Sequence, residues 1–134
     1  MPSLSCVLLV DDDQTTNFLN QRLLQKLAVT DHILTAQDGQ QALDLLARNC
    51  QPLTPTCPGL ILLDVNMPGM NGIQFLEEYQ QLPLAAQKAI VIVMLTTSLH
   101  PRDVQRVEKL QAVSGFISKP LTAEKMQNIL EKFF

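Results

Sequence analysis

Four short segments of this 134-residue sequence are each followed by side chains that could take part in chemistry: Asp11 with Asp12, Asp64, Thr96 and Lys119. Three carboxylates brought together would repel one another, and a divalent cation removes that repulsion. Carboxylate oxygens suit Mg²⁺, which keeps several water ligands and usually shares its site with phosphate. A lysine and a hydroxyl could then bind phosphoryl oxygens, because phosphoryl transfer depends mainly on positioning and charge neutralisation. Asp64 is the candidate nucleophile, which would form an aspartyl phosphate.

These side chains can converge only if the segments before them are parallel strands of one sheet. Residues 60–63 are four consecutive aliphatic residues, which is typical of a strand buried on both faces. Further strands are predicted at residues 6–10, 32–36, 90–95 and 115–118. Parallel strands deliver their carboxyl ends to one edge of the sheet, where ligands bind in open α/β folds.

Segments with helical spacing of apolar residues alternate with the strands. Asp13 or Thr15 would cap the first helix, which carries apolar residues at positions 18, 19, 23, 24 and 27. The second helix should run to about residue 49, the third from about 73 to 82, and the fourth from Pro101. The last begins at Thr122, which with Lys125 falls short of a full capping box. The order βαβαβαβαβα predicts a doubly wound parallel α/β sheet with right-handed crossovers.

Composition places the chain among ordinary globular proteins, with 46% hydrophobic and 17% charged residues. A net charge of -3 gives no support for nucleic-acid binding. The longest apolar run, residues 89–95, is too short to cross a bilayer, and the N-terminus does not resemble a signal peptide. We therefore expect a cytoplasmic chain without membrane or nucleic-acid partners, and a single domain over residues 1–134.

The three cysteines, Cys6, Cys50 and Cys57, are odd in number and lack CxxC spacing. This pattern argues against a disulfide framework or a zinc site, so we expect reduced thiols without a function. Residues 51–58 contain three prolines and are expected to form an exposed loop before the third strand. This loop would lie at the far end of that strand from Asp64.

Taken together, the motifs resemble the receiver domains of two-component response regulators, the CheY-like family. The matching segments span almost the whole chain in the family's order: Val10-Asp11-Asp12, Asp64 within residues 63–72, Leu95-Thr96-Thr97, and Phe116 through Lys119-Pro120. Any one of them is a weak signal, and four together are a strong one. The resemblance implies a flavodoxin-like sheet with strand order 2-1-3-4-5.

The resemblance also implies roles for individual residues. Asp64 matches the phosphoacceptor, and Asp11 and Asp12 match the acidic pair that holds Mg²⁺, with Mn²⁺ as a possible substitute. The backbone carbonyl of Asn66 would be a further ligand, whereas Asp13 falls just past the pair and is not expected to bind the metal.

Further positions match the family's switch. Thr96 corresponds to the switch hydroxyl, Lys119 to the phosphate-pairing lysine, and Phe116 to the aromatic residue that changes exposure on activation. Asn66 and Ser98, two residues beyond Asp64 and Thr96, occupy positions that tune the phosphoryl lifetime in the family.

The resemblance implies a stand-alone receiver, a signalling switch rather than a turnover enzyme. Its phosphodonor would be a sensor histidine kinase or a histidine phosphotransfer protein. With no output domain in residues 1–134, the signal would pass to an unknown protein partner through the face of the fourth helix, fifth strand and fifth helix. A receiver excised from a longer kinase or regulator remains an alternative.

Simpler interpretations and rival functions compete with this one. The acids at 11–13 could simply cap the first helix, Asp64 could be a turn residue, and Lys119 could be an exposed lysine. A small phosphohydrolase with an aspartate nucleophile would be expected to carry a second acid at position 66, where Asn66 stands. An interaction module with a vestigial site is disfavoured because the full set of site residues is present.

Overall fold

The computed structural model describes residues 4–50, 56–65, 67, 69–82, 90–96 and 113–134. Within them, five parallel strands form one sheet in the order β2-β1-β3-β4-β5, which confirms the predicted order. The strands are β1 (Val7–Val10), β2 (Ile33–Ala36), β3 (Leu60–Asp64), β4 (Val91–Thr96) and β5 (Gly115–Ser118).

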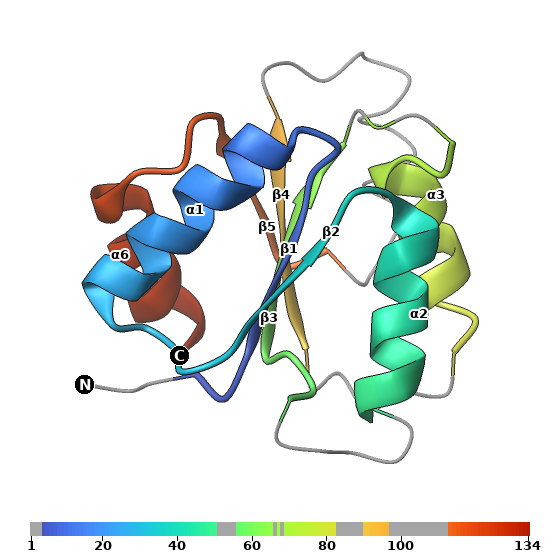
Figure 1. Cartoon of the computed structure of the whole chain (residues 1–134), viewed down its shortest axis with the longest axis horizontal. Helices are drawn as coiled ribbons and strands as arrows, with labels where there is room; N and C mark the ends of the chain where they lie inside the picture. The colour runs from blue at the N-terminus through green and yellow to red at the C-terminus, as the bar shows by residue number, and fades with distance from the viewer. Residues whose placement is uncertain (1–3, 51–55, 66, 68, 83–89, 97–112) are drawn as a thin grey trace.

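Helices cover both faces of the sheet, as predicted. The described helices are α1 (Gln14–Leu27), α2 (Gly39–Cys50), α3 (Gly72–Tyr79) and α6 (Ala123–Phe133). Figure 1 shows α1 and α6 on one face and α2 and α3 on the other. The third helix ends at Tyr79 rather than near residue 82, and the fourth helix predicted from Pro101 lies outside the described residues. No described helix has the length and apolar character needed to span a bilayer.

Alternate strand residues point into two separate cores. Val7 and Leu9 of β1 pack with α1 and α6, whereas Leu8 and Val10 pack with α2 and α3. Strands β3 and β4 alternate in the same way, so each central strand is apolar on both faces. This explains why these strands read as continuous aliphatic runs, and it leaves only their ends free for polar side chains.

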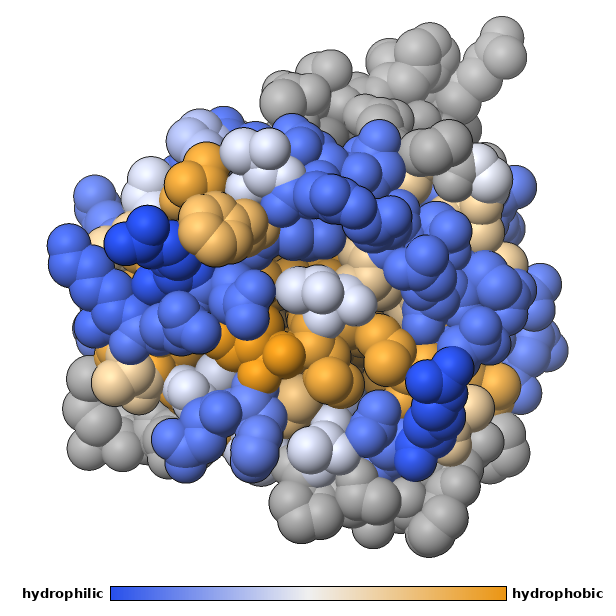
Figure 2. Space-filling model, viewed as in Figure 1, coloured by the Kyte–Doolittle hydropathy of each residue, from blue (hydrophilic) through white to orange (hydrophobic). Residues whose placement is uncertain are grey.

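Helix α1 differs from the prediction in the face that it buries. Phe18 and Leu19 are 56% and 59% exposed, whereas Asn17 and Asn20 are buried together with Leu24. The buried residues are spaced i, i+3 and i+7, so the helix presents two amides to the sheet and turns two large apolar side chains outward. Apolar surface is visible over α1 in Figure 2, in addition to a central band between the two helix layers.

The cysteine prediction is wrong for two of the three thiols. Cys50 and Cys57 form a disulfide across seven residues, and their Cα atoms are 4.9 Å apart. The end of α2 and the segment before β3 come close enough for this bond, which the spacing in the sequence did not indicate. Cys57 and Pro58 are also buried, so this end of the 51–58 loop is not exposed as expected. Cys6 is a free thiol, as predicted, and it is buried.

Candidate functional site

Three carboxylates meet at the carboxyl edge of the sheet. Asp11 directly follows β1 and Asp64 ends the neighbouring β3, and each is 4% exposed, while Asp12 is exposed. One carboxylate oxygen from each of the three lies within 4.8 Å of the others. Three hard oxygen donors at this spacing fit a divalent cation such as Mg²⁺, which would relieve the repulsion between two buried carboxylates.

Lys119 joins this cluster from the end of β5. Its ammonium lies 2.8 Å from Oδ2 of Asp11 and 3.0 Å from Oδ1 of Asp64. Burial alone would lower the pKa of Lys119, but the hydrogen bonds and charges of Asp11 and Asp64 outweigh it and raise the pKa above its usual value. Lys119 is therefore a fixed cation beside the candidate nucleophile.

Asp13 has a different task from the two acids before it. Its backbone N–H donates to Oδ1 of Asp11 (2.9 Å), and its own carboxylate accepts from the Thr15 N–H and the Thr16 hydroxyl. The hydrogen bond from the Thr16 hydroxyl is the main cause of a lowered pKa of Asp13. The structure thus uses Asp13 as the N-cap of α1, which is one of the two caps predicted from the sequence.

Asn17 supports the same loop and was missed in the sequence. Its Nδ2 donates to the backbone carbonyls of Asp11 (2.9 Å) and Ala36 (3.3 Å), so it ties the end of β1 to the end of β2. Among the described residues, its Oδ1 is the buried side-chain atom without a hydrogen-bond partner. An asparagine within the apolar stripe of a helix is the signal that could have identified it.

The backbone after Asp64 is held by α3. The Gly72 N–H donates to the Val65 carbonyl (3.0 Å), and Asn71 caps α3 in a capping box with Gln74. A Cβ atom at position 72 would collide with the backbone carbonyl oxygen of Asp64. Glycine is therefore needed for this close approach of the helix to the strand.

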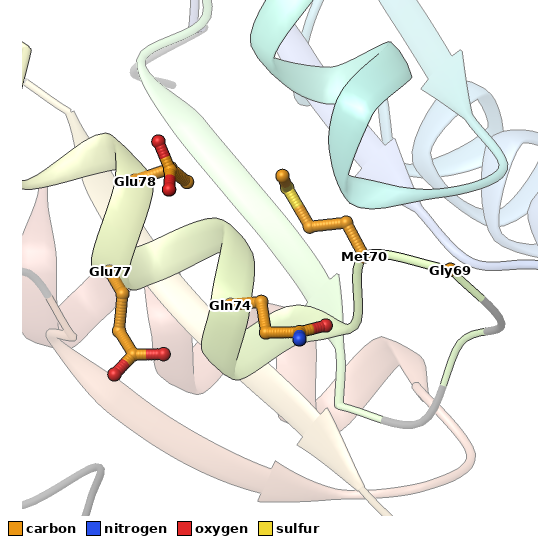
Figure 3. Close-up of a pocket in the computed structure, with 5 residues that line it drawn as sticks. All are labelled: Gly69, Met70, Gln74, Glu77 and Glu78. Atoms are coloured by element: carbon orange, nitrogen blue, oxygen red, sulfur yellow. The ribbon is translucent and has the colours of Figure 1, made fainter.

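The turn between β3 and α3 is also tied to α2. The Gly39 N–H donates to the Met70 carbonyl (3.0 Å), and the Met70 side chain extends toward α2, as Figure 3 shows. Figure 3 also shows a shallow hollow lined by Gly69, Met70, Gln74, Glu77 and Glu78. No predicted site residue is among these five, and we assign this hollow no role.

The remaining predicted site residues are placed only in part. Thr96 ends β4 and pairs with Ser118 of β5 in the sheet register, but its side chain lies outside what the structure describes, as do Asn66 and Ser98. Phe116 lies in β5 and is 50% exposed. The structure thus brings together Asp11, Asp12, Asp64 and Lys119.

Comparisons with known proteins agree with this geometry. Residues 7–131 match the family described as the response regulator receiver domain. The chain is 34% identical to the probable chemotaxis protein CheY of Rhizobium etli over 96% of this chain and 91% of that protein. It is 33% identical to the chemotaxis protein CheY of Pseudomonas aeruginosa, over 96% and 94% of the two chains.

A solved structure gives the same result. A two-component response regulator from Cytophaga hutchinsonii superposes with a TM-score of 0.84 and 31% identity, over 97% of this chain and 96% of that one. Residues 7–131, which match the receiver-domain family, contain all five described strands and also Asp11, Asp12, Asp64 and Lys119. The parallel sheet, the acid cluster and the family match lead to one conclusion, which is that this chain belongs to the response regulator receiver domain family.

Proposed function

We propose that this chain is a phosphorylation-controlled switch in a two-component phosphorelay, with Asp64 as the phosphoacceptor. The observation that carries the proposal is the position of the Lys119 ammonium, 2.8 Å from Asp11 and 3.0 Å from Asp64. Asp12 completes the cluster of three carboxylates. A buried carboxylate next to a fixed cation and a metal-binding set of oxygens suits the acceptor of a phosphoryl group.

In the proposed reaction, a carboxylate oxygen of Asp64 bonds to phosphorus while the bond from phosphorus to the donor imidazole nitrogen breaks. The phosphohistidine ring is protonated on its other nitrogen. The electron pair of the broken bond stays on the imidazole, so the histidine departs as a neutral ring. Lys119 binds a phosphoryl oxygen and Thr96 donates a hydrogen bond to another. Asp11, Asp12 and Asp64 would hold Mg²⁺ or Mn²⁺ with the Asn66 carbonyl, and the bound ion would neutralise phosphoryl charge.

The donor would be a sensor histidine kinase or a histidine phosphotransfer protein. A hollow beside the site supports docking there, because Leu19 of α1 lines it together with Lys119 and Pro120. Phe18 and Leu19 are the large exposed apolar side chains of α1. Their burial against a helix of the donor would remove apolar surface from water and so favour binding.

The output would pass to a separate protein through the fourth helix, β5 and α6. Phe116 is half exposed in β5, so it can change its environment when Thr96 and Lys119 move toward a phosphoryl group. Asn66 and Ser98 would tune the lifetime of that group. We propose that residues 1–134 act as one receiver module in the cytoplasm, and that the chain assists only its own phosphorylation and dephosphorylation.

The test is the intact mass of the chain after incubation with acetyl phosphate and Mg²⁺, beside an Asp64→Asn variant. A single phosphoryl adduct that needs Mg²⁺ and is absent from the variant would support the proposal. An adduct of equal yield on Asp64→Asn would overturn the assignment of Asp64. No adduct on either protein would favour a phosphorylation-independent interaction module.

A further inference from the structure

We propose that Lys125 is a positioning residue for Lys119, which it controls by binding the loop that carries it. This inference rests on the proposed function of Asp64 and Lys119. The Lys125 ammonium donates to the carbonyl of Ser118 (2.8 Å), the hydroxyl of Ser118 (3.3 Å) and the carbonyl of Pro120 (3.0 Å). The two carbonyls belong to the residues directly before and after Lys119, so Lys125 bridges the loop on both sides of it.

The contacts use the full capacity of the side chain. A lysine ammonium has three N–H donors and no acceptor, and the three oxygens of Ser118 and Pro120 match that number. Hydrogen bonds from a charged donor are stronger than neutral ones. Lys125 is therefore held by three oxygens of the loop, although its ammonium lies at the protein surface.

The position of Lys125 in α6 does not explain the lysine. Thr122 is the N-cap, and its hydroxyl accepts from the Lys125 backbone N–H, which makes Lys125 the third residue of the helix. A capping box places Glu or Gln there, and a positive charge in the first turn opposes the helix dipole. The helix would gain from another residue at this position, so the loop contacts are the physical reason for a lysine.

The loop has a second anchor, which separates positioning from folding. Leu121 is 8% exposed and packs in the core between the sheet and α6. Without Lys125, the loop would remain attached through Leu121, but the Ser118 and Pro120 carbonyls would lose their cation. The backbone of Lys119 would then be less restricted, and its ammonium would reach Asp11 and Asp64 in fewer conformations.

Lys125 also connects the site to the surface around Phe116. A hollow between β5 and α6 is lined by Phe116, Lys125, Ile129 and Phe133, among others. A movement of Lys119 toward a phosphoryl group would therefore be transmitted through the Lys125 contacts to this hollow. The same residue that orients Lys119 thus lies on the route to the proposed output face.

The experiment compares Lys125→Gln with Lys132→Gln. Glutamine at position 125 completes a capping box with Thr122, so it preserves α6 while it removes the ammonium. Lys132 is exposed in the last turn of the same helix, and its substitution makes the same change in net charge. The measurements are the phosphorylation rate with acetyl phosphate and Mg²⁺, the thermal midpoint, and amide hydrogen exchange in residues 118–122.

We expect Lys125→Gln to be phosphorylated about tenfold more slowly, which corresponds to about 1.4 kcal/mol in the barrier. Its loop amides should exchange faster, with an unchanged thermal midpoint, while Lys132→Gln behaves like the wild type. In a Lys119→Met background, Lys125→Gln should cause no further loss of rate, because Lys125 acts through Lys119.

Equal rates in the wild type and Lys125→Gln would overturn this inference alone. A slower rate that comes with an equivalent loss of thermal stability would also overturn it, because Lys125 would then serve the fold. A further tenfold loss in the Lys119→Met background would show that Lys125 acts independently of Lys119. No adduct on the wild-type chain would overturn the proposed function, and this inference with it.

Discussion

The Lys119 ammonium lies 3.0 Å from the Asp64 carboxylate although β4 separates their two strands in the sheet. The same ammonium reaches Asp11, which follows β1 on the far side of β3. One cation thus connects the carboxyl ends of three strands. Its removal concentrates negative charge at the edge of the sheet, and that has consequences for stability and for metal binding.

Lys119→Met should lower the free energy of unfolding by about 2 to 3 kcal/mol in the absence of metal. The reason is that two buried carboxylates lose the cation that they share. Mg²⁺ should raise the thermal midpoint of this variant more than that of the wild type, since the ion then supplies the positive charge that Lys119 no longer provides to the two carboxylates. Thermal unfolding with and without Mg²⁺ tests this, and Lys26→Met, which removes an exposed charge on α1, is the control. A smaller Mg²⁺ effect in Lys119→Met than in the wild type would contradict the shared site.

Gly72→Ala should destabilise the fold by about 1 to 3 kcal/mol, because the new methyl group would collide with the Asp64 carbonyl oxygen. The neighbour is backbone, so it cannot rotate away as a flexible side chain could. Gly59→Ala is the matched control, since its Cβ would meet only the Leu4 side chain at 3.9 Å. Urea unfolding of both variants measures the difference. Equal midpoints for the two variants would show that α3 can shift without cost.

The sheet and the acid cluster could be predicted because each depends on short sequence patterns, which are aliphatic runs with polar residues at their ends. Each central strand is a run of aliphatic residues, and the residues that follow or end these runs are Asp11, Asp64 and Thr96. Parallel connections then require these ends to meet at one edge. The pattern needs no information about side-chain packing, and the predicted strand order and the meeting of Asp11, Asp12, Asp64 and Lys119 are confirmed.

The supporting residues could not be predicted because they depend on how elements are rotated and how closely they approach. Asn17 is buried because α1 turns its Asn17–Asn20 side toward the sheet, which hydropathy alone did not indicate. Lys125 reaches Ser118 and Pro120 because the segment between β5 and α6 places their carbonyls beside the first turn of the helix. The Cys50–Cys57 disulfide depends on the distance between the end of α2 and the start of β3.

Asn17→Leu should lower the free energy of unfolding by roughly 2 kcal/mol, because the buried carbonyls of Asp11 and Ala36 would lose a shared donor. It should also weaken Mg²⁺ binding, since the β1–α1 loop that orients Asp11 and Asp12 would be less restricted. Thr15→Val, an exposed substitution in the same turn, is the control. Titration calorimetry with Mg²⁺ gives the affinity, and an unchanged affinity in Asn17→Leu would limit Asn17 to a role in the fold.

Tyr79 should make stability fall at high pH. Burial raises the pKa of its hydroxyl above the usual value of 10.0, because the ionised form is poorly solvated against Phe75 and the core. The folded chain thus holds the proton more tightly than the unfolded chain does. The associated stability is fully present below about pH 10 and is lost as the pH rises through the raised pKa. Urea unfolding at rising pH should show a shallower decline in Tyr79→Phe. Some decline should remain, because Lys119 and Cys6 also have raised pKa values.

Reduction of the Cys50–Cys57 disulfide should lower the free energy of unfolding by roughly 2 kcal/mol, because it releases a short loop in the unfolded chain. The Thr56 hydroxyl also donates to the Asn49 side chain across the same gap, so the folded loop keeps one tie after reduction. Alkylation under denaturing conditions should modify Cys6 alone without reductant and all three cysteines with it.

The same reduction should leave chemistry at Asp64 unchanged, because the disulfide precedes β3 and Asp64 ends that strand. A Cys50→Ser/Cys57→Ser variant should have the stability of the reduced chain and no response to reductant. In a reducing cytosol Cys50 and Cys57 would exist as thiols. The chain would there be less stable than the disulfide form by the measured difference in the free energy of unfolding. Three alkylated cysteines without reductant would contradict the disulfide. A reductant-dependent phosphorylation rate would instead show that the far end of β3 is coupled to its carboxyl end.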